Sequence, residues 1–224
     1  MNRPIKLGLA LTGAAFFAAA AGCNIVGPAV VLIHGPEKQA ASFTLDDKLT
    51  TVVFVDDRGN RLDRRSLRLT IAKNATDILL KDGGLKKVVD PSAPLTRVSG
   101  EGSEEPTAIA TLGKSVGADI VIYATVDAFT LSEDSVTFKP SAVLRVKVLD
   151  CNNEPARLWP EEKAGKTITV EVATRHGAAP KNGSDYAKAQ ENLAKECGRA
   201  IAELFYKHQI QRRVQETNDR GGGG

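Results

Sequence analysis

Hydrophobic positions near the start of the folded part of the chain recur first with strand spacing and then with helix spacing. The run Thr50 to Val55 is β-branched and aromatic and leads into turn residues, so it predicts a strand. A helix is expected from Asp63, as its N-cap, to Gly83-Gly84. Apolar residues recur between these limits at three- and four-residue intervals, from Leu67 to Leu79, and predict one buried helix face.

The next elements are shorter. Val88-Val89 predicts a short strand, which the turn residues Asp90-Pro91 close. Ser99 to Glu105 is polar and is expected to be a loop. Pro106 suits the first turn of a second helix, which Gly117 is expected to end.

Three strands are predicted in succession after this helix. Ala118 to Leu131 is apolar on both alternating faces, which predicts a central strand that is covered on both sides. Val136 to Asp150 and Lys166 to Arg175 alternate between apolar and polar residues, so each is expected to have one wetted face. Together the three strands predict an antiparallel meander.

A long helix is predicted to follow from about Ser184, as N-cap, because apolar residues recur at helical spacing as far as Phe205. The complete order is then β-α-β-α-β-β-β-α. This order predicts an α/β fold with a single mixed sheet, an antiparallel meander and covering helices.

The N-terminus has the pattern of a bacterial lipoprotein signal peptide. Arg3 and Lys6 precede an apolar run from Leu7 to about Ala19, and Ala20-Ala21-Gly22-Cys23 ends the run with small residues and a cysteine. Cleavage before Cys23 leaves a cysteine for lipid attachment, with palmitate among its acyl chains. The alternative is an uncleaved helix, since about 20 apolar residues span a bilayer, although Gly27-Pro28 interrupts that run. Both alternatives tether the chain to a membrane.

The chain is therefore expected to have four parts. These are the signal peptide (1–22), a membrane-proximal connector (23–48), a globular α/β domain (49–215) and a flexible tail (216–224). Within the connector, Val30 to Ile33 and Phe43 to Leu45 are apolar enough to dock onto the domain.

Composition narrows the choice of partners. Without Arg3 and Lys6, the remaining 28 basic and 27 acidic residues carry a net charge of +1. The two signs are interspersed, so no nucleic-acid partner is expected. With Cys23 assigned to lipid, Cys151 and Cys197 can pair in an oxidising envelope. Alternatively, Cys197 serves as a small hydrophobic residue on the apolar stripe of its helix.

The sequence contains no pattern that points to catalysis or to a bound metal. His34, His176 and His208 are far apart and have no partner at metal-ligand spacing. There is no Gly-x-Ser-x-Gly elbow, and the glycine pairs lack the context of a phosphate loop. We therefore expect a protein that is not an enzyme, with no catalytic residue, no metal and no cofactor.

Two features are candidates for partner binding. One is a group of arginines around the start of the first predicted helix: Arg58, Arg61, Arg64, Arg65 and Arg68. They can form ion pairs with Asp56, Asp57 and Asp63, or they can bind anionic groups of a partner or of lipid headgroups. The other is the single tryptophan, Trp159, which precedes Pro160 in a predicted loop. It can cover a sheet edge or act as an exposed hot spot for a partner.

The segment Thr111 to Tyr123 has Leu112-Gly113 in a helix and Gly117-Ala118-Asp119 before an apolar strand. With Val148-Leu149-Asp150 and Trp159, it resembles a group of envelope lipoproteins similar to the curli secretion channel subunit and the lipoprotein activator of penicillin-binding proteins. The resemblance covers roughly residues 50–213 and implies the fold and an envelope setting. With 5% aromatic residues, the sequence shows no extra membrane-spanning hairpins of the kind a channel subunit needs.

The sequence thus predicts a lipoprotein that is anchored through Cys23 in a bacterial cell envelope, with the periplasmic face of the outer membrane favoured over the inner membrane. Its expected function is that of a non-catalytic protein-interaction module in envelope assembly or regulation. The partner is then an unidentified envelope protein or a second copy of the chain. Two alternatives stay open: an oligomeric component of a secretion pore, and a protein that binds or hydrolyses the cell wall.

Overall fold

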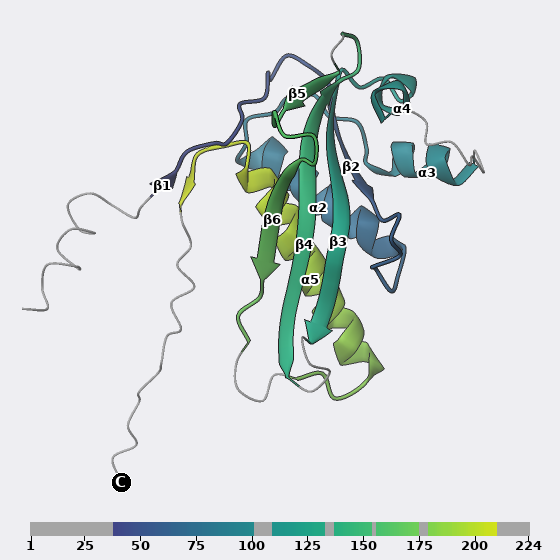
Figure 1. Ribbon diagram of the computed structural model, residues 1–224, viewed down its shortest axis with the longest axis vertical. Coiled ribbons are helices and arrows are strands. Elements are labelled where there is room, and N and C mark those ends of the chain that lie inside the picture. The colour runs from purple at the N-terminus through teal and green to yellow at the C-terminus, as the bar shows by residue number, and fades with distance from the viewer. Residues whose placement is uncertain (1–37, 101–108, 133–136, 154–155, 175–178, 210–224) are drawn as a thin grey trace, which may run out of the picture. The chain divides into compact units, whose positions relative to one another are not determined.

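A five-stranded mixed sheet organises the fold (Figure 1). The computed structural model describes residues 38–100, 109–132, 137–153, 156–174 and 179–209. The strands run in the order β2-β3-β4-β5, and β6 also pairs with β4. Their bounds are β2 (Thr51–Asp56), β3 (Ile120–Ser132), β4 (Phe138–Asp150), β5 (Arg157–Trp159) and β6 (Lys166–Glu171). Two very short strands, β1 (Lys38–Gln39) and β7 (His208–Gln209), form a separate two-stranded sheet.

β3 is the central strand, as the sequence predicts. It runs parallel to β2, with Thr51 opposite Ile120, and antiparallel to β4, with Ile120 opposite Asp150. The described part of the crossover from β2 to β3 contains the helices α2 (Ser66–Lys81), α3 (Ser92–Gly100) and α4 (Ile109–Ser115). β4 pairs antiparallel with both β5 and β6. The predicted α/β fold with one mixed sheet and an antiparallel meander is confirmed.

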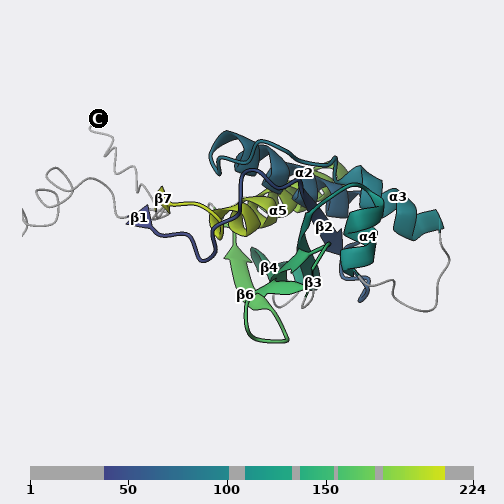
Figure 2. The ribbon, with the colours of Figure 1, turned by 90° about the horizontal axis from the view of Figure 1, so that it is seen from above.

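The main core lies between one face of the sheet and two helices, α2 and α5 (Gly183–Glu203). Figure 2 shows α2 and α5 together on one side of the sheet. The alternating residues of the strands and the apolar stripes of both helices are buried there, which stabilises the fold through loss of apolar surface from water. Fully buried examples are Val55, Ile122, Leu144, Ile71, Leu193 and Ile201.

The opposite face of the sheet carries a smaller core under α4. Gly113 of α4 lies directly over the sheet, since a Cβ at this position would clash with Val121 Cγ2 and lie 2.6 Å from Cys151 Sγ. Val52, Phe54 and Leu112 complete this cluster of buried residues. The burial is confined to one end of the face, because further along β4 the outward side chains are only half-buried.

Helix boundaries are where the structure differs most from the sequence-based expectation. Asp63 does not cap α2, which begins at Ser66 after Arg65 and has no side-chain cap. The cap of α5 is Asn182 rather than Ser184, because the Asn182 side chain accepts a hydrogen bond of 2.9 Å from the backbone N–H of Asp185.

Other differences concern short elements. The predicted turn at Asp90 starts α3, because the Asp90 carboxylate accepts a hydrogen bond of 2.7 Å from the backbone N–H of Ser92. Ser99 therefore belongs to α3 rather than to a loop. Val88 forms only an isolated bridge to Thr51. Pro106 and the rest of the predicted loop, 101–105, lie outside the described residues.

The two described cysteines are unpaired and lie on opposite faces of the sheet. Cys151 belongs to the small core under α4, and Cys197 belongs to the main core. Burial raises the pKa of Cys151 to about 11 and raises that of Cys197 as well. The structure therefore favours the alternative in which Cys197 acts as a small hydrophobic residue, and it places Cys151 in the same kind of environment.

The segment before β2 packs against the domain. Phe43, Leu45 and Leu49 contact the main core, as the sequence predicts for Phe43 to Leu45. The backbone N–H groups of Ser42 and Phe43 both donate to the Leu204 carbonyl, at 2.7 and 3.2 Å, and so satisfy a carbonyl at the end of α5. Val30 to Ile33, the predicted signal peptide and Cys23 lie outside the described residues. Among the residues that are described, no helix is long and apolar enough to cross a membrane.

The contact between α2 and α5 can be tested at Gly198. A Cβ at this position would lie 2.5 Å from the Ile71 carbonyl oxygen and 2.9 Å from Asn74 Cβ. Overpacking of this kind costs up to about 3 kcal/mol, against roughly 1 kcal/mol gained from helix propensity. Gly198→Ala is therefore expected to lower the free energy of unfolding by about 1–2 kcal/mol in denaturant melts.

Gly183→Ala is the matched control, because nothing lies within 4 Å of a Cβ placed there. This variant should change stability by less than about 0.5 kcal/mol. A Gly198→Ala protein as stable as the wild type would show that the two helices do not approach as closely as described.

Candidate functional site

The five arginines predicted as a binding feature lie in the loop after β2 and in the first turn of α2. We call Arg58, Arg61, Arg64, Arg65 and Arg68 the arginine edge. The loop is fixed by Asp57, whose carboxylate accepts hydrogen bonds from the backbone N–H groups of Arg61 at 2.7 Å and Leu62 at 3.0 Å. The Leu62 side chain is buried and anchors the loop to the core. Backbone constraints therefore hold the arginine edge in place.

A buried carboxylate, Asp56, organises the inner side of the arginine edge. Asp56 ends β2 and is 7% exposed. Its Oδ2 accepts hydrogen bonds from the Tyr123 hydroxyl at 2.8 Å and from Arg58 Nε at 2.7 Å. The Arg68 guanidinium lies 3.6 Å from Asp56 Oδ1 and donates from Nε to the Val55 carbonyl at 2.9 Å. The carboxylate is thus occupied by three partners.

Two aromatic rings support this centre. Phe54 stacks on Tyr123 with ring centroids 5.8 Å apart, and the Arg68 guanidinium lies 5.8 Å from the centroid of Phe54. A guanidinium in this position is attracted to the face of the ring. Phe54, which stacks on Tyr123, therefore holds Arg68 from the side of the sheet, while Asp56 holds it from the end of β2.

The environment of Asp56 shifts the pKa of its neighbours. Burial, and next the negative charge of Asp56, raise the pKa of Tyr123 well above its usual value, so the phenol remains a hydrogen-bond donor. The hydrogen bond to Asp56 raises the pKa of Arg58. Burial lowers the pKa of Arg68, and the attraction of Asp56 opposes that effect. The Tyr123 phenol and the Arg58 guanidinium thus stay in their protonated, donating forms.

Arg64 joins the arginine edge to α5. Its Nε donates to the Gln190 side-chain oxygen at 3.1 Å, and its terminal nitrogen donates to the Ala187 carbonyl at 2.9 Å. The buried Gln190 amide in turn donates to Asp63, which also accepts a hydrogen bond from the Tyr186 hydroxyl. Asp63 is therefore used in this contact between the loop and α5, and this explains why it does not cap α2.

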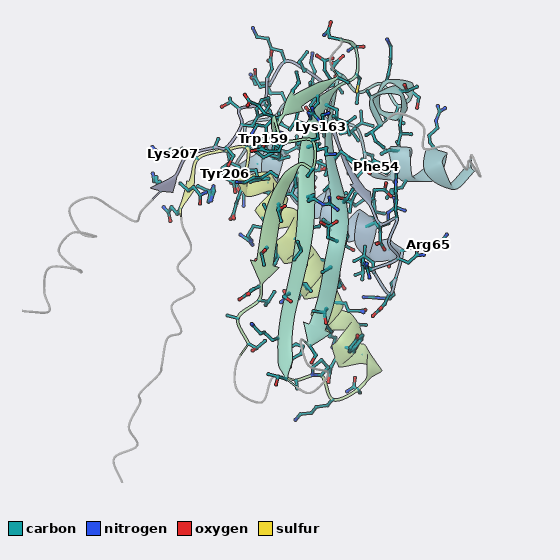
Figure 3. All side chains as sticks on the ribbon, viewed as in Figure 1. Phe54, Arg65, Trp159, Lys163, Tyr206 and Lys207 are labelled. Atoms are coloured by element: carbon teal, nitrogen blue, oxygen red, sulfur yellow. The ribbon has the colours of Figure 1, made fainter. Side chains whose placement is uncertain are left out.

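The arginine edge divides into two groups. Arg58 and Arg68 pair with Asp56, and Arg64 bonds to α5, so the ion-pair interpretation holds for part of the cluster. Arg61 and Arg65 are exposed and form no ion pair with any residue that the structure describes. Figure 3 shows Arg65 pointing away from the domain on the side of β2. These two guanidiniums are available to an external anion.

Trp159 lies in an aromatic cluster rather than in a loop. It is the last residue of β5, opposite Val148 of β4. Its ring centroid is 6.1 Å from that of Phe43 and 6.0 Å from that of Phe205. Trp159 is half-buried and Pro160 is buried, whereas Leu158 is 45% exposed. This geometry matches the interpretation in which Trp159 covers the sheet edge.

No pattern in the sequence marks Lys147 and Arg157, two cations on the sheet, as candidate binding residues. The alternation along β4 places Lys147 on a wetted face, and Arg157 stands in a segment predicted as turn and loop. Only the pairing of β4 with β5 brings them together. Within the described ranges, no group of three or more His, Cys, Asp or Glu residues is arranged to hold a metal ion.

The fold and the site together define a mixed α/β domain with an arginine-rich surface at one end of a parallel strand pair. No family model and no curated protein matches the sequence. Solved structures that resemble it include the PelC dodecamer from Paraburkholderia phytofirmans, with 12% identity, a TM-score of 0.42, and coverage of 77% of this chain and 97% of that one.

Two further structures resemble the chain. Lipoprotein GNA1162 from Neisseria meningitidis has 15% identity and a TM-score of 0.39, with 64% of this chain and 95% of that chain covered. The LpoB C-terminal domain from Salmonella enterica has 11% identity and a TM-score of 0.32, with 66% and 94% covered. Similarity at this level identifies no function for the chain.

The raised pKa of Tyr123, caused first by burial and then by the charge of Asp56, predicts a pH dependence of stability. The folded protein holds the phenol proton more tightly than the unfolded chain, whose tyrosines titrate near 10. The unfolded state therefore loses this proton first as the pH rises above about 10, and stability falls, by at most about 1.4 kcal/mol per pH unit for one group. In denaturant melts between about pH 9 and pH 11.5, Tyr123→Phe should show a weaker decline than the wild type. Equal declines would contradict the shifted pKa.

The aromatic cluster predicts different effects at two neighbouring positions. Trp159→Ala removes the ring that contacts Phe43 and Phe205, and should lower the free energy of unfolding by about 2–3 kcal/mol. Leu158→Ala changes an exposed side chain and should cost less than about 0.5 kcal/mol. Chemical denaturation measures both. A Trp159→Ala variant with unchanged stability would favour the exposed hot-spot interpretation.

Proposed function

We propose that this chain is a bacterial envelope lipoprotein, acylated on Cys23, whose α/β domain acts as a non-catalytic protein-interaction module. The leader Ala20-Ala21-Gly22-Cys23 supports the lipid anchor. Two or more acyl chains give stable membrane binding. The periplasmic face of the outer membrane is the favoured location. The partner is an envelope protein that presents an acidic surface, and the role is in envelope assembly or regulation.

The observation that carries this proposal is the contrast within the arginine edge. Arg58, Arg64 and Arg68 are used by the protein itself, whereas Arg61 and Arg65 are exposed and lack an ion pair among the described residues. Both project from a loop and a helix start that Asp57 and Leu62 hold in place. Guanidiniums on a fixed support bind carboxylates well because both of their N–H edges are already oriented.

The chemistry of the buried groups supports binding rather than catalysis. The Asp56 carboxylate is occupied by Tyr123, Arg58 and Arg68, and so is poorly placed to take a proton from a substrate. Cys151 and Cys197 are buried, and burial raises the pKa of both thiols, whereas a cysteine nucleophile needs a lowered pKa. Asp56, Cys151 and Cys197 are thus poorly suited to react with a substrate.

The test is crosslinking in native cells followed by mass spectrometry, with the full-length chain. Arg61→Gln with Arg65→Gln removes the two free guanidiniums, and Lys73→Gln with Lys188→Gln removes two exposed charges elsewhere, on α2 and α5. The arginine variant should lose at least about four-fifths of the crosslinked partner, whereas the lysine variant should retain it. In Cys23→Ser, the acyl mass on residue 23 should be absent from the intact-mass spectrum.

Several outcomes would contradict the proposal. Retention of the crosslink in the arginine variant would show that the arginine edge is not the binding surface. An intact mass with Met1 present and no acyl group on residue 23 would exclude the lipid anchor. A ring-shaped particle that inserts into liposomes would indicate a pore component instead, and turnover of purified peptidoglycan would indicate a cell-wall hydrolase.

A further inference from the structure

The sheet has a face that no described helix covers beyond α4. We define the open sheet face as the outward side of β3, β4 and β6, opposite α2 and α5. Strand pairing arranges its residues in rows. Tyr123 of β3 lies opposite Lys147 of β4 in one row, and Thr125, Arg145 and Thr167 form the next row.

Arg145 on this face is already neutralised. Its guanidinium makes two parallel hydrogen bonds to the Asp127 carboxylate, at 2.6 and 2.7 Å. The pairing raises the pKa of Arg145. A bidentate pair of this kind is geometrically specific and fixes both side chains on the sheet. Arg145 is therefore poorly available to an external anion, and binding of an anion on this face depends on the other cations, Lys147 and Arg157.

Lys147 lies one row away from Arg145 on the same face of β4. Its aliphatic stem lies over Gly165, where a Cβ would be 3.1 Å from both Lys147 Cγ and Cε. The charges that act on it come from Arg157 of β5 and from Arg145. Leu149 pairs with Arg157, so β5 presents Arg157 beside the same stretch of β4. Neither Lys147 nor Arg157 has a carboxylate partner in the described part of the chain.

This arrangement is electrostatically unfavourable in the isolated protein. Burial, then Arg157 and Arg145, lower the pKa of Lys147, which means that the environment disfavours its charge. Like charges in a partly buried site repel more strongly than in water. An anion that bound between Lys147 and Arg157 would remove this repulsion, and part of its binding free energy would come from that relief.

We propose that Lys147 and Arg157 bind a carboxylate side chain from an acidic segment of the protein partner, docked on the open sheet face. This inference rests on the proposed function, because it takes the partner to be a protein. One carboxylate oxygen faces the Lys147 ammonium and the other faces the Arg157 guanidinium, with Arg145 still held by Asp127. Exposed Thr167 and Thr169 of β6 add hydroxyl groups for the backbone of the segment.

An acidic peptide fits this face better than an anionic membrane surface. The same face carries the carboxylates of Asp127 and Glu171, the latter opposite Ser141. A plane of lipid phosphates would meet these carboxylates together with the cations, and like-charge contacts are costly. A single carboxylate placed at Lys147 and Arg157 avoids them. The pattern of charge thus favours binding of a single carboxylate over binding of an extended anionic surface.

The experiment measures binding of a fluorescein-labelled peptide of ten glutamates to the full chain in detergent micelles, by fluorescence anisotropy at low salt. Lys147→Gln with Arg157→Gln should weaken binding at least about tenfold, because each lost charge contact affects affinity directly. The matched control, Lys73→Gln with Lys188→Gln, changes the net charge by the same amount and should weaken binding less than about twofold. Denaturant melts of each variant check that folding is intact.

Other outcomes separate this inference from the proposed function. Suppose that Lys147→Gln with Arg157→Gln binds the peptide like the wild type, while Arg61→Gln with Arg65→Gln does not. The inference about Lys147 and Arg157 is then wrong, and the proposal that the arginine edge binds the partner is supported. If no variant affects binding, or if the lysine control weakens it equally, neither the arginine edge nor the pair Lys147 and Arg157 is the binding site, and both proposals are overturned. If vesicles of phosphatidylglycerol bind through Lys147 and Arg157 and the peptide does not, the site is a membrane contact and the inference fails.

Discussion

The burial of the first part of β3, from Ile120 to Ala124, on both faces is the constraint on which the rest of the structure depends. Val121 and Ile122 point to opposite faces of the sheet, and each is almost fully buried. A strand of this kind needs a neighbour on each side and a helix layer on each face. The parallel crossover from β2, the antiparallel return of β4 and the separate placement of α2, α5 and α4 all meet this requirement. Because α4 is only seven residues long, the cover on its face ends early.

The polar surfaces follow from this limited cover. Under α4 the outward residues of β3 are apolar, as Val121 is. Beyond the end of α4 the outward residues of β3 and β4 include the charged Asp127, Arg145 and Lys147. Tyr123 stands at the boundary. Its ring belongs to the small core and its hydroxyl reaches Asp56, so it links the open sheet face to the arginine edge. The two cationic surfaces are therefore attached to one buried hydrogen-bond centre.

The sequence predicted the elements whose own periodicity is strong. β3, β4 and the apolar stripes of α2 and α5 were placed correctly because burial repeats at strand or helix spacing over many residues. Elements that depend on tertiary contacts were missed. β5 is three residues long and exists because β4 pairs with it. α3 begins two residues after Asp90, which the local pattern assigns to a turn.

For the candidate site, the sequence predicts which residues take part but not which contacts they make. The arginines were visible in the sequence, but their division into paired and free members depends on Asp56 and on Gln190, which is 126 residues from Arg64. Trp159 was visible too, whereas its contact with Phe43 required the segment before β2 to return to β5. Lys147 and Arg157 became a pair only through strand register, which no local signal encodes.

The central claim is that Lys147 and Arg157, beside the open sheet face, have no carboxylate partner among the residues that the structure describes. The most direct measurement is the pKa of Lys147, from a pH titration of the protein with ¹³C-labelled lysine by NMR, in the absence of any partner. The account predicts a value below the ordinary 10.5, which moves back towards 10.5 in Arg157→Gln. A value at or above 10.5 in the wild type would show that a carboxylate already neutralises the site, and would contradict the account.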